Sequence, residues 1–295
     1  LFSSNTHIMT SDLTKEDADD LLNDSITVYK LILSLVKSLQ HCHANSIVHF
    51  DLKPENIMLK NNGEYTLHLV DFGAAKDLSE TDRWIGPIGG SYTYIPPRQK
   101  AVEYFMEYDI FENKEIVNNS KMCDIYSLGC IIFNILTANT VIPWFNPDEY
   151  FDWTPPTELG HSRSYGSFFK NDTQHGGNFL ATVEEKITPF KTRLVSEYNQ
   201  HIRERRTQIS LNDSIINYVR NEMLLTFGDI NISPTHNAED ILHGLVVVLT
   251  DLIDMSTREH GSTVVPTTAA GTGERSTAWA ETEATELSGL KRMSL

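Results

Sequence analysis

The chain has 295 residues, and an apolar fraction of 40% is enough for a hydrophobic core in one large domain or two modest ones. Its 40 acidic and 24 basic side chains give a formal charge of −16, which argues against nucleic acid as the main partner. Three scattered cysteines exclude a disulfide framework, and no stretch reaches the roughly 18 apolar residues of a membrane span, so we expect an intracellular, cytoplasmic protein.

The N-terminal part of the chain combines an acidic segment with an amphipathic helix. Residues 1–24 are polar and acidic, with too few apolar side chains to form a domain alone. From Ser25, which is a good N-cap residue, apolar residues follow the i, i+3, i+4, i+7 spacing as far as Cys42. The pattern predicts a helix of roughly 18 residues with a wide apolar stripe that faces a core.

A short strand and a hairpin are predicted next. SIVHF at residues 46–50 indicates a short buried strand or bend, and NIMLK at 56–60 indicates a strand. The NNG turn at 61–63 tolerates the positive φ of a tight turn, so TLHLVDF at 66–72 is expected to return beside the first strand. In such a hairpin, the residues before the first strand and after the second come out at the same end.

The second half of the chain is predicted to be mainly helical. Residues 122–137 are apolar nearly all round, as expected of a helix in the centre of a domain. Residues 143–180 are rich in Pro, Gly, Asn and aromatic side chains and indicate a long surface loop or insertion. Further helices are expected at about 181–204, 213–226 and 238–254. Residues 256–295 bury too little apolar area to offset the entropy of ordering, so we expect a disordered tail.

Several polar residues lie at one end of the predicted hairpin. Asp51 follows the first buried segment and Asp71 ends the second hairpin strand, so Asp51, Asn56 and Asp71 are expected to converge. Carboxylate and amide oxygens suit Mg²⁺, which proteins usually hold through one or two carboxylates plus substrate phosphates. Lys53 adds a positive charge that can neutralise a phosphate. A single Asp at a strand end is more often a cap or turn residue, but the spacing of the whole set favours chemistry.

These residues resemble the motifs of eukaryotic protein kinases. HFDLKPEN at 49–56 is similar to their catalytic loop, and DFG at 71–73 matches their magnesium-binding motif. GGSYTYIPPR at 89–98 resembles their substrate-binding loop and the segment that follows it, and DIYSLGCIIF at 124–133 resembles the central helix of their large lobe. The resemblance spans about residues 20–250 and indicates the Ser/Thr type.

The resemblance implies an α+β, mainly α-helical fold, which is a kinase-like large lobe with a short catalytic-loop hairpin. This domain would occupy residues 25–255, and the 143–180 insertion would belong to it. No Gly-rich loop, strand lysine or helix with its glutamate partner is found before the catalytic loop, so we expect the small N-terminal lobe to be missing. Because the sequence begins with Leu1 and not Met, we expect a fragment of a longer product that binds Mg-ATP poorly by itself.

The resemblance also implies roles for residues of the catalytic loop. Asp51 would accept the proton of the substrate hydroxyl, and Lys53 would stabilise charge on the γ-phosphate of ATP. Asn56 and Asp71 would hold two Mg²⁺ ions that bridge the phosphates. Glu55 is grouped with these residues as part of the cofactor-binding loop.

Other positions have weaker assignments. By the resemblance, Met58 would be an apolar floor under the adenine, and Ser91 would contact the catalytic Asp and Lys. Asp124 would hydrogen-bond the backbone of the catalytic loop, which is a structural role. His41 and His43 end the amphipathic helix, where packing at a helix end is more common than metal binding.

Two positions depart from the family pattern. Phe50 replaces the catalytic-loop Arg that pairs in many kinases with a phosphate on the activation segment. We therefore hypothesise that any activity does not depend on that phosphorylation switch. Arg98 replaces the Glu that closes the substrate segment, and Ser233 lies where its usual Arg partner would be, so both sides of an ion pair are changed.

Two functions remain open from the sequence. The first is a protein serine/threonine kinase that uses ATP and Mg²⁺ on a protein substrate, with a regulatory partner docking at the 143–180 insertion. The second is a non-catalytic, kinase-like (pseudokinase) module that binds other proteins. The complete set of Asp51, Lys53, Asn56 and Asp71 favours the first, because a module released from catalysis has no physical reason to keep all four.

Overall fold

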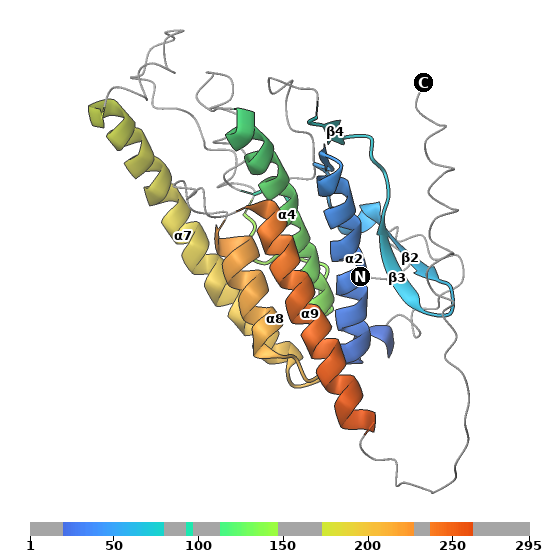
Figure 1. Cartoon of the computed structure of the whole chain (residues 1–295). Coiled ribbons are helices and arrows are strands. Elements are labelled where there is room, and N and C mark those ends of the chain that lie inside the picture. The colour runs from blue at the N-terminus through green and yellow to red at the C-terminus, as the bar shows by residue number, and fades with distance from the viewer. Residues whose placement is uncertain (1–19, 80–92, 97–112, 147–172, 227–236, 262–295) are drawn as a thin grey trace, which may run out of the picture. The chain divides into compact units, whose positions relative to one another are not determined.

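The computed structural model of the chain describes residues 20–79, 93–96, 113–146, 173–226 and 237–261 (Figure 1). The chain divides into a unit over Leu1–Arg258 and a second unit over Glu259–Leu295. The helices and strands described below belong to the first unit, apart from the last residues of the final helix. None of the described helices is long and apolar enough to cross a membrane.

Helix α2 spans Ser25–Ala44 and presents the predicted apolar stripe to the core. Its N-cap is Asp24 and not Ser25, because the Asp24 carboxylate accepts a hydrogen bond from the Thr27 amide at 2.8 Å. An ionised cap satisfies an orphan amide and also complements the positive end of the helix dipole, so the predicted cap was wrong by one residue. The fully buried side chains of this helix are Val28, Leu31, Ile32, Leu35, Val36 and Leu39.

Two short antiparallel ladders follow α2. Strand β1 (Ile47–Val48) pairs with β4 (Lys76–Asp77), and β2 (Ile57–Asn61) pairs with β3 (Tyr65–Leu69). Gly63 in the turn between β2 and β3 has a φ of 93°, as the NNG pattern predicted. The hairpin prediction is therefore confirmed, including the arrangement in which the start of β2 lies opposite the end of β3.

Helix α2 fixes the hairpin from one side. The Ser34 hydroxyl accepts a hydrogen bond from the Leu67 amide of β3 at 2.8 Å, which satisfies an amide on the outer edge of the ladder. Lys30 of the same helix pairs with Glu64 in the hairpin turn at 2.8 Å. The position of the hairpin is thus set by the helix that precedes it in sequence.

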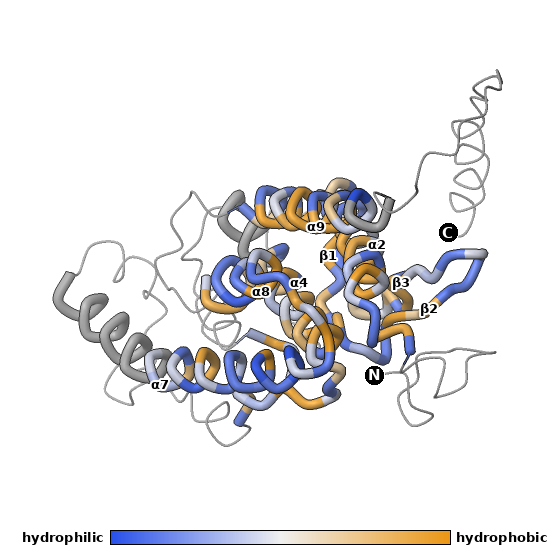
Figure 2. Tube along the Cα trace, turned by 90° about the horizontal axis from the view of Figure 1, so that it is seen from below, coloured by the Kyte–Doolittle hydropathy of each residue, from blue (hydrophilic) through white to orange (hydrophobic). Residues whose placement is uncertain are grey.

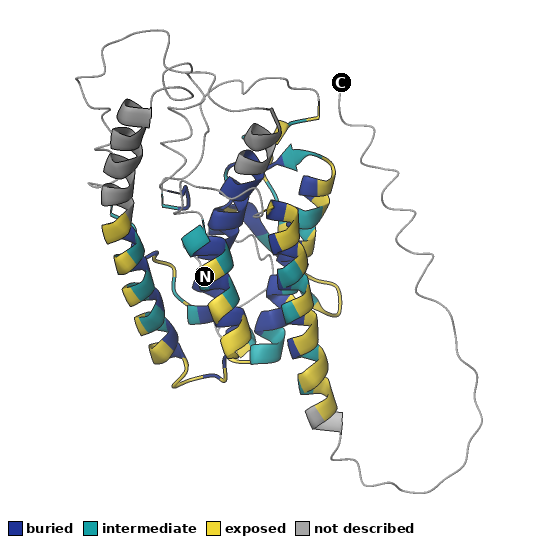
Figure 3. Ribbon diagram, turned by 60° about the vertical axis from the view of Figure 1, so that its left-hand side comes forward, coloured by how far each residue is buried: buried dark blue, intermediate teal, exposed yellow. Residues whose placement is uncertain are grey.

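Helix α4 (Asn113–Thr137) lies in the centre of the helical layer, as its uniformly apolar sequence predicted. It begins earlier than the predicted start at residue 122, and nearly every side chain from Ser120 to Leu136 is buried (Figure 3). The helix contacts α2, α7 and the π-helix η2. Gly129 permits a close approach, because a Cβ there would lie 2.9 Å from Leu224 Cδ2.

Three further helical segments complete the described part of the chain. Helix α7 spans Thr173–Arg205, α8 spans Asp213–Tyr218 and continues as the π-helix η2 (Val219–Leu225), and α9 spans Ala238–Gly261. In Figure 2 the apolar side of α9 turns toward α2 and α4. The mainly helical architecture agrees with the prediction.

Two predicted boundaries were wrong. The insertion was expected to continue to residue 180, but α7 already begins at Thr173, because the two glycines in TQHGGNFL cost only about 1 kcal/mol each in a long helix. The disordered tail was expected from residue 256, but α9 continues to Gly261, because the residues there are compatible with a helix and need no buried face to prolong it. The rest of the predicted insertion from residue 147, and the rest of the tail, lie outside the described residues.

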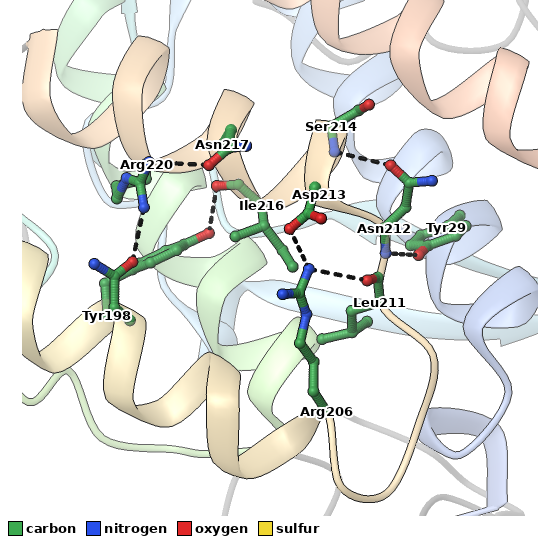
Figure 4. Close-up of polar contacts among 11 residues, drawn as sticks. Tyr29, Tyr198, Arg206, Leu211, Asn212, Asp213, Ser214, Ile216, Asn217 and Arg220 are labelled. Carbon is green, nitrogen blue, oxygen red and sulfur yellow. Dashed lines mark hydrogen bonds and ion pairs between the residues drawn. The ribbon is translucent and has the colours of Figure 1, made fainter.

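Polar contacts fix the corner between α7 and α8 (Figure 4). The Tyr29 hydroxyl of α2 accepts a hydrogen bond from the Asn212 amide at 2.9 Å, and the Asn212 side chain caps α8 by accepting from the Ser214 amide. The Tyr198 hydroxyl of α7 donates to the Ile216 carbonyl at 3.0 Å. These bonds connect three helices around the core and satisfy groups that the corner would otherwise leave unpaired.

Candidate active site

The predicted base, cation and amide come together in one cluster. Lys53 Nζ donates to Asp51 Oδ2 at 2.7 Å. Asn56 Nδ2 donates to the Asp51 backbone carbonyl at 2.8 Å and to Asp51 Oδ2 at 3.0 Å. The side chains of Lys53 and Asp51 are 24% and 17% exposed, so both can be reached from solvent while the protein limits how they move.

Local sequence explains why this loop holds its shape. Leu52 and Ile57 are each 2% exposed and anchor the loop in the core on both sides. Pro54 begins the single 3₁₀ turn Pro54–Asn56, where its fixed φ suits the first position. Asn56 is 4% exposed, and its amide satisfies the loop backbone from inside.

The hairpin brings Asp71 next to this cluster. The Val70 amide donates to the Asn56 carbonyl at 3.0 Å, one step before the first β2–β3 pair of Ile57 with Leu69. Asp71 follows directly, with an exposed side chain that accepts from the Gly73 amide at 3.2 Å. Asp71 therefore lies at the same end of the hairpin as Asn56, and the convergence of their side chains with Asp51 stays a prediction.

Asp71 has a φ of 59°, in the left-handed region that a non-glycine residue rarely occupies. Such a conformation costs about 1–3 kcal/mol and persists only where the surroundings impose it. Here the chain is held on both sides, by the β2–β3 ladder before Asp71 and by β4 after it, where the Leu78 amide donates to the Ser46 carbonyl at 2.9 Å. Backbone strain of this kind is typical of functional positions.

His49 joins the catalytic loop to the segment around Asp71. It is fully buried, and its Nε2 lies 3.2 Å from the Val70 carbonyl oxygen. Its ring is tilted against the ring of Phe72 with centroids 4.8 Å apart, and Phe72 is 45% exposed. One buried histidine thus contacts both residues that flank Asp71.

Asp124 of α4 supports the catalytic loop from below, as the prediction for this residue required. Its Oδ2 accepts from the His49 amide at 2.8 Å and its Oδ1 from the Phe50 amide at 2.9 Å. A third donor, His43 Nε2, lies 3.0 Å from Oδ2. Sequence reasoning missed this third contact, because the position of His43 at a helix end favoured a packing role.

Phe50 is 6% exposed and has a φ of 62°. The Phe50 side chain therefore lies in the core and carries no charge. No sequence signal indicated the left-handed backbone, because aromatic residues rarely adopt it. The hydrogen bonds that the His49 and Phe50 amides donate to Asp124 account for the left-handed backbone at Phe50.

Two oxygen donors at the site fit a magnesium ion. Asn56 uses its amide nitrogen on Asp51, so its amide oxygen points away from that residue, and the Asp71 carboxylate is exposed at the same end of the hairpin. Both are hard ligands of the kind that Mg²⁺ prefers, and the ion usually needs only one or two carboxylates besides phosphate oxygens. In the described part of the chain, no group of three or more His, Cys, Asp or Glu side chains gathers as a metal centre.

The remaining predicted residues have different positions. Met58 is half-buried on β2, on the opposite face from the buried Ile57 and Leu59, so it faces away from the core. Glu55 is exposed on the 3₁₀ turn beside the cluster. Ser91, Arg98, Ser233 and residues 147–172 of the predicted partner-binding insertion lie outside the described residues, so their roles stay predictions.

The buried cysteines are poor candidates for a nucleophile. Burial and, second, the nearby charge of Asp124 raise the pKa of the Cys42 thiol to about 11, and burial also raises the pKa of Cys130. Both thiols are therefore protonated near neutral pH and shielded from reagents.

Comparison with known proteins agrees with this geometry. A family model described as protein kinase domain matches residues 4–153. The serine/threonine-protein kinase cds1 of Schizosaccharomyces pombe is 32% identical over 176 residues, which cover 58% of this chain and 34% of that protein. Death-associated protein kinase dapk-1 of Caenorhabditis elegans is 26% identical over 176 residues, which cover 55% of this chain and 11% of that protein. The chain thus spans about a third or less of the length of these relatives.

A crystal structure of the yeast RNA polymerase II CTD kinase CTDK-1 complex matches 42% of this chain and 35% of that chain, with 20% sequence identity and a TM-score of 0.32. The family model covers residues 4–153, which are 150 of the 295 residues and so more than half of the chain. The matched residues include the loop from Asp51 to Asn56, the strained Asp71 and the supporting Asp124. The chain belongs to the protein kinase domain family.

Proposed function

We propose that this domain acts as a protein serine/threonine kinase that transfers the γ-phosphate of ATP to a hydroxyl group of a protein substrate. The observation that carries the proposal is the cluster of Asp51, Lys53 and Asn56, joined by hydrogen bonds of 2.7, 2.8 and 3.0 Å. A carboxylate base, a cation and two metal-ligand oxygens in one place are what phosphoryl transfer requires.

Asp51 is the proposed general base. It takes the proton of the substrate hydroxyl while that oxygen bonds to the γ-phosphorus, the bond to the β–γ bridging oxygen breaks, and ADP leaves. Asn56 holds the Asp51 carbonyl and carboxylate together, so the direction of the carboxylate is set before the substrate arrives. A positioned base of this kind contributes about 10²–10⁴-fold to the rate.

Lys53 is the proposed partner of the transferred phosphate. Its ammonium pairs with Asp51 in the structure, and its flexible four-carbon stem allows it to turn toward a phosphate without moving the backbone. In that position its charge stabilises the negative charge that develops on the γ-phosphate oxygens.

Protein kinases in general use ATP and Mg²⁺, and the proposal extends this to the present chain. When bound, Mg²⁺ would offset the negative charge of the phosphates. The Asn56 amide oxygen and the Asp71 carboxylate are the groups that would hold the ion. Met58, half-buried on the open face of β2, would support the adenine, and Glu55 would line the edge of the cofactor-binding loop.

The proposal includes an activity that does not require phosphorylation of the activation segment. An Arg in place of Phe50 could pair with a phosphate on the activation segment, but the buried aromatic ring found there has no charge to offer. The loop is held by Asp124 and its backbone bonds, which need no added phosphate. This supports an activity that is independent of phosphorylation near Ser79 and Thr93.

The proposal is tested by the product of the reaction. The full-length protein is incubated with labelled ATP, Mg²⁺ and a mixed protein substrate, and the labelled amino acids are identified after hydrolysis. We expect phosphoserine and phosphothreonine, loss of label with excess EDTA, and recovery when Mg²⁺ is restored. Absence of label in the folded protein under all metal conditions would contradict the proposal and favour the non-catalytic binding module instead.

A further inference from the structure

Arg220 of the π-helix η2 is surrounded by the side-chain oxygens of three asparagines. Its Nη1 donates to Asn199 Oδ1 of α7 at 2.7 Å. Its Nη2 donates to Asn217 Oδ1 of α8 at 2.9 Å (Figure 4), and its Nε donates to Asn221 Oδ1 at 3.1 Å. Arg220 itself is partly exposed. Its guanidinium is therefore held in one direction by α7 and by the α8–η2 helix while it stays open to solvent.

The described contacts of Arg220 leave its charge without a counter-ion. No carboxylate of the described residues forms an ion pair with it, although the chain has 40 acidic side chains. Arg206, which follows α7 directly, does pair with a carboxylate, that of Asp213. An aspartate at position 199 would accept the same hydrogen bond and neutralise the cation. A tie between two helices therefore does not by itself account for the neutral Asn199.

The orientation of the three asparagines follows from the chemistry of arginine. A guanidinium has five N–H hydrogens and no acceptor, so each amide must present its oxygen to Arg220 and turn its NH₂ group to the other side. None of these three NH₂ groups has an acceptor in the described structure, and Arg220 uses three of its five hydrogens. The surface around Arg220 thus offers hydrogen-bond donors and a positive charge.

The backbone at Arg220 provides an independent observation. Val219–Leu225 form a π-helix, a conformation found for well under 1% of residues and frequent at functional sites. Met223 and Leu224 are buried on its inner side, where a Cβ at Gly129 of α4 would approach both of them closely. Arg220 is partly exposed and Asn221 is exposed, so the widened helix presents its polar residues to solvent.

We propose that Arg220, together with the amides of Asn199, Asn217 and Asn221, forms a binding site for a phosphate group. A phosphate monoester carries a charge of about −1.5 to −2 near neutral pH and three acceptor oxygens, which match a site made of donors and one cation. Because the guanidinium is already fixed, little side-chain entropy is lost when the anion binds. The inference does not depend on the role of Asp51, because none of these residues belongs to the catalytic loop.

The charge of the whole chain works against this site. A formal charge of −16 repels anions at long range, but salt screens that repulsion beyond about 8 Å at physiological ionic strength. Affinity for phosphate therefore has to come from the short contacts at Arg220. For this reason, substitutions at the site are expected to weaken binding far more than a change of charge elsewhere on the surface.

Side-chain NMR of the ¹⁵N-labelled full chain tests the site. The NH₂ signals of Asn217 and Asn221 are followed at constant ionic strength as inorganic phosphate, a peptide with one phosphoserine, or acetate is added. We expect saturable shifts with phosphate, at a Kd at least about tenfold below that of acetate. Arg220→Gln is expected to raise the Kd for phosphate about tenfold or more. Arg203→Gln, at an exposed arginine in the last turn of α7, is the matched control and should change it less than about twofold.

Asn199→Asp separates binding from a structural tie. The aspartate keeps the hydrogen bond to Arg220 and adds an ion pair, so urea denaturation should give a free energy of unfolding at or above that of wild type. Its Kd for phosphate is nevertheless expected to rise about tenfold or more, because the cation is neutralised. Should Arg220→Gln fail to fold, Asn199→Asp decides the question.

The two phosphate probes identify the source of the ligand. A lower Kd for the phosphoserine peptide assigns the phosphate to a protein partner, and an equal Kd assigns it to free phosphate; both results support the site. The inference is overturned if wild type shows no saturable shift, or if acetate binds as tightly as phosphate. It is also overturned if Asn199→Asp binds phosphate like wild type, or if Arg203→Gln weakens binding as much as Arg220→Gln.

Discussion

At the scale of single residues, the candidate site depends on side chains that each hydrogen-bond two groups at once. Asn56 donates to both the carbonyl and the carboxylate of Asp51, which leaves its amide oxygen directed away from Asp51. Asp124 holds two consecutive amides with two different oxygens. Small changes of shape at these positions are therefore expected to affect the chemistry more than the fold.

Asn56→Ala tests the double role of the amide. It removes the donor to the Asp51 carbonyl and one proposed metal ligand, so we expect transfer to fall by about 10²-fold and the free energy of unfolding to fall by about 1–3 kcal/mol. Urea denaturation followed by circular dichroism measures the second effect, and initial rates measure the first. Wild-type rates in the folded variant would show that Asn56 has no part in the reaction.

The buried Phe50 leads to a prediction about regulation. The test protein combines Ser79→Ala, Thr81→Ala and Thr93→Ala. Its kcat/KM is expected to stay within about twofold of wild type, because residue 50 is a buried phenylalanine that cannot pair with a phosphate. Circular dichroism confirms that the variant is folded. Loss of activity in a folded triple variant would mean that phosphorylation acts on the loop by another route.

At the scale of elements, α2, the hairpin and α4 could be predicted from the sequence because their periodicity and turn residues agree with their packing. The same hairpin geometry predicted that Asp51, Asn56 and Asp71 converge. The helix boundaries at Thr173 and Gly261 could not be predicted. Glycine-rich residues at the start of α7 and polar residues at the end of α9 prolong each helix without an apolar pattern that would mark them in the sequence.

Two features of the site were also beyond sequence reasoning. The left-handed Phe50 results from hydrogen bonds to a carboxylate far along the chain, so no local pattern signals it. The contact of His43 with Asp124 likewise joins α2 to α4, and pairwise contacts between helices do not follow from the periodicity of either helix. Both features depend on tertiary packing.

Gly244 of α9 marks a close contact between elements. The Tyr218 hydroxyl donates to the Ile241 carbonyl at 2.8 Å, and a Cβ at residue 244 would lie 2.3 Å from that hydroxyl oxygen. Gly244→Ala is therefore expected to lower the free energy of unfolding by about 1–3 kcal/mol, although alanine is the better helix former.

The double variant with Tyr218→Phe provides the control for this contact. Removing the hydroxyl removes the shortest contact of the added Cβ, so the two substitutions together are expected to cost less than the sum of their separate costs, as measured by urea denaturation. Strict additivity would mean that the helices shift apart at Gly244 instead of pressing on Tyr218.

At the scale of the whole molecule, buried acids that keep their protons link stability to pH. Burial raises the pKa of Cys42 from 9.0 to about 11 and that of Tyr218 from 10.0 to about 12. Burial also raises the pKa values of Tyr94 and Tyr198. Because the folded state binds these protons more tightly than the unfolded state, their contribution is fully present below about pH 9 and is lost as the pH rises toward 12.

We therefore expect the urea midpoint to be nearly constant from about pH 7 to 8.5 and to fall progressively above about pH 9. In Cys42→Ala the decline between about pH 9 and 11 should be shallower, because one of these groups is gone. A midpoint in wild type that stays constant up to about pH 11 would contradict the account of these buried groups.

The central claim is that Asp51 is the base of a phosphoryl transfer, and the most direct measurement compares the full-length wild type with Asp51→Asn. Asparagine keeps the size and hydrogen bonds of the side chain but cannot take a proton, so we expect kcat to fall by about 10³-fold with KM for ATP little changed. Asp77→Asn, at an exposed carboxylate outside the cluster, is the matched control and should retain wild-type rates. Equal transfer by wild type and Asp51→Asn would contradict the account.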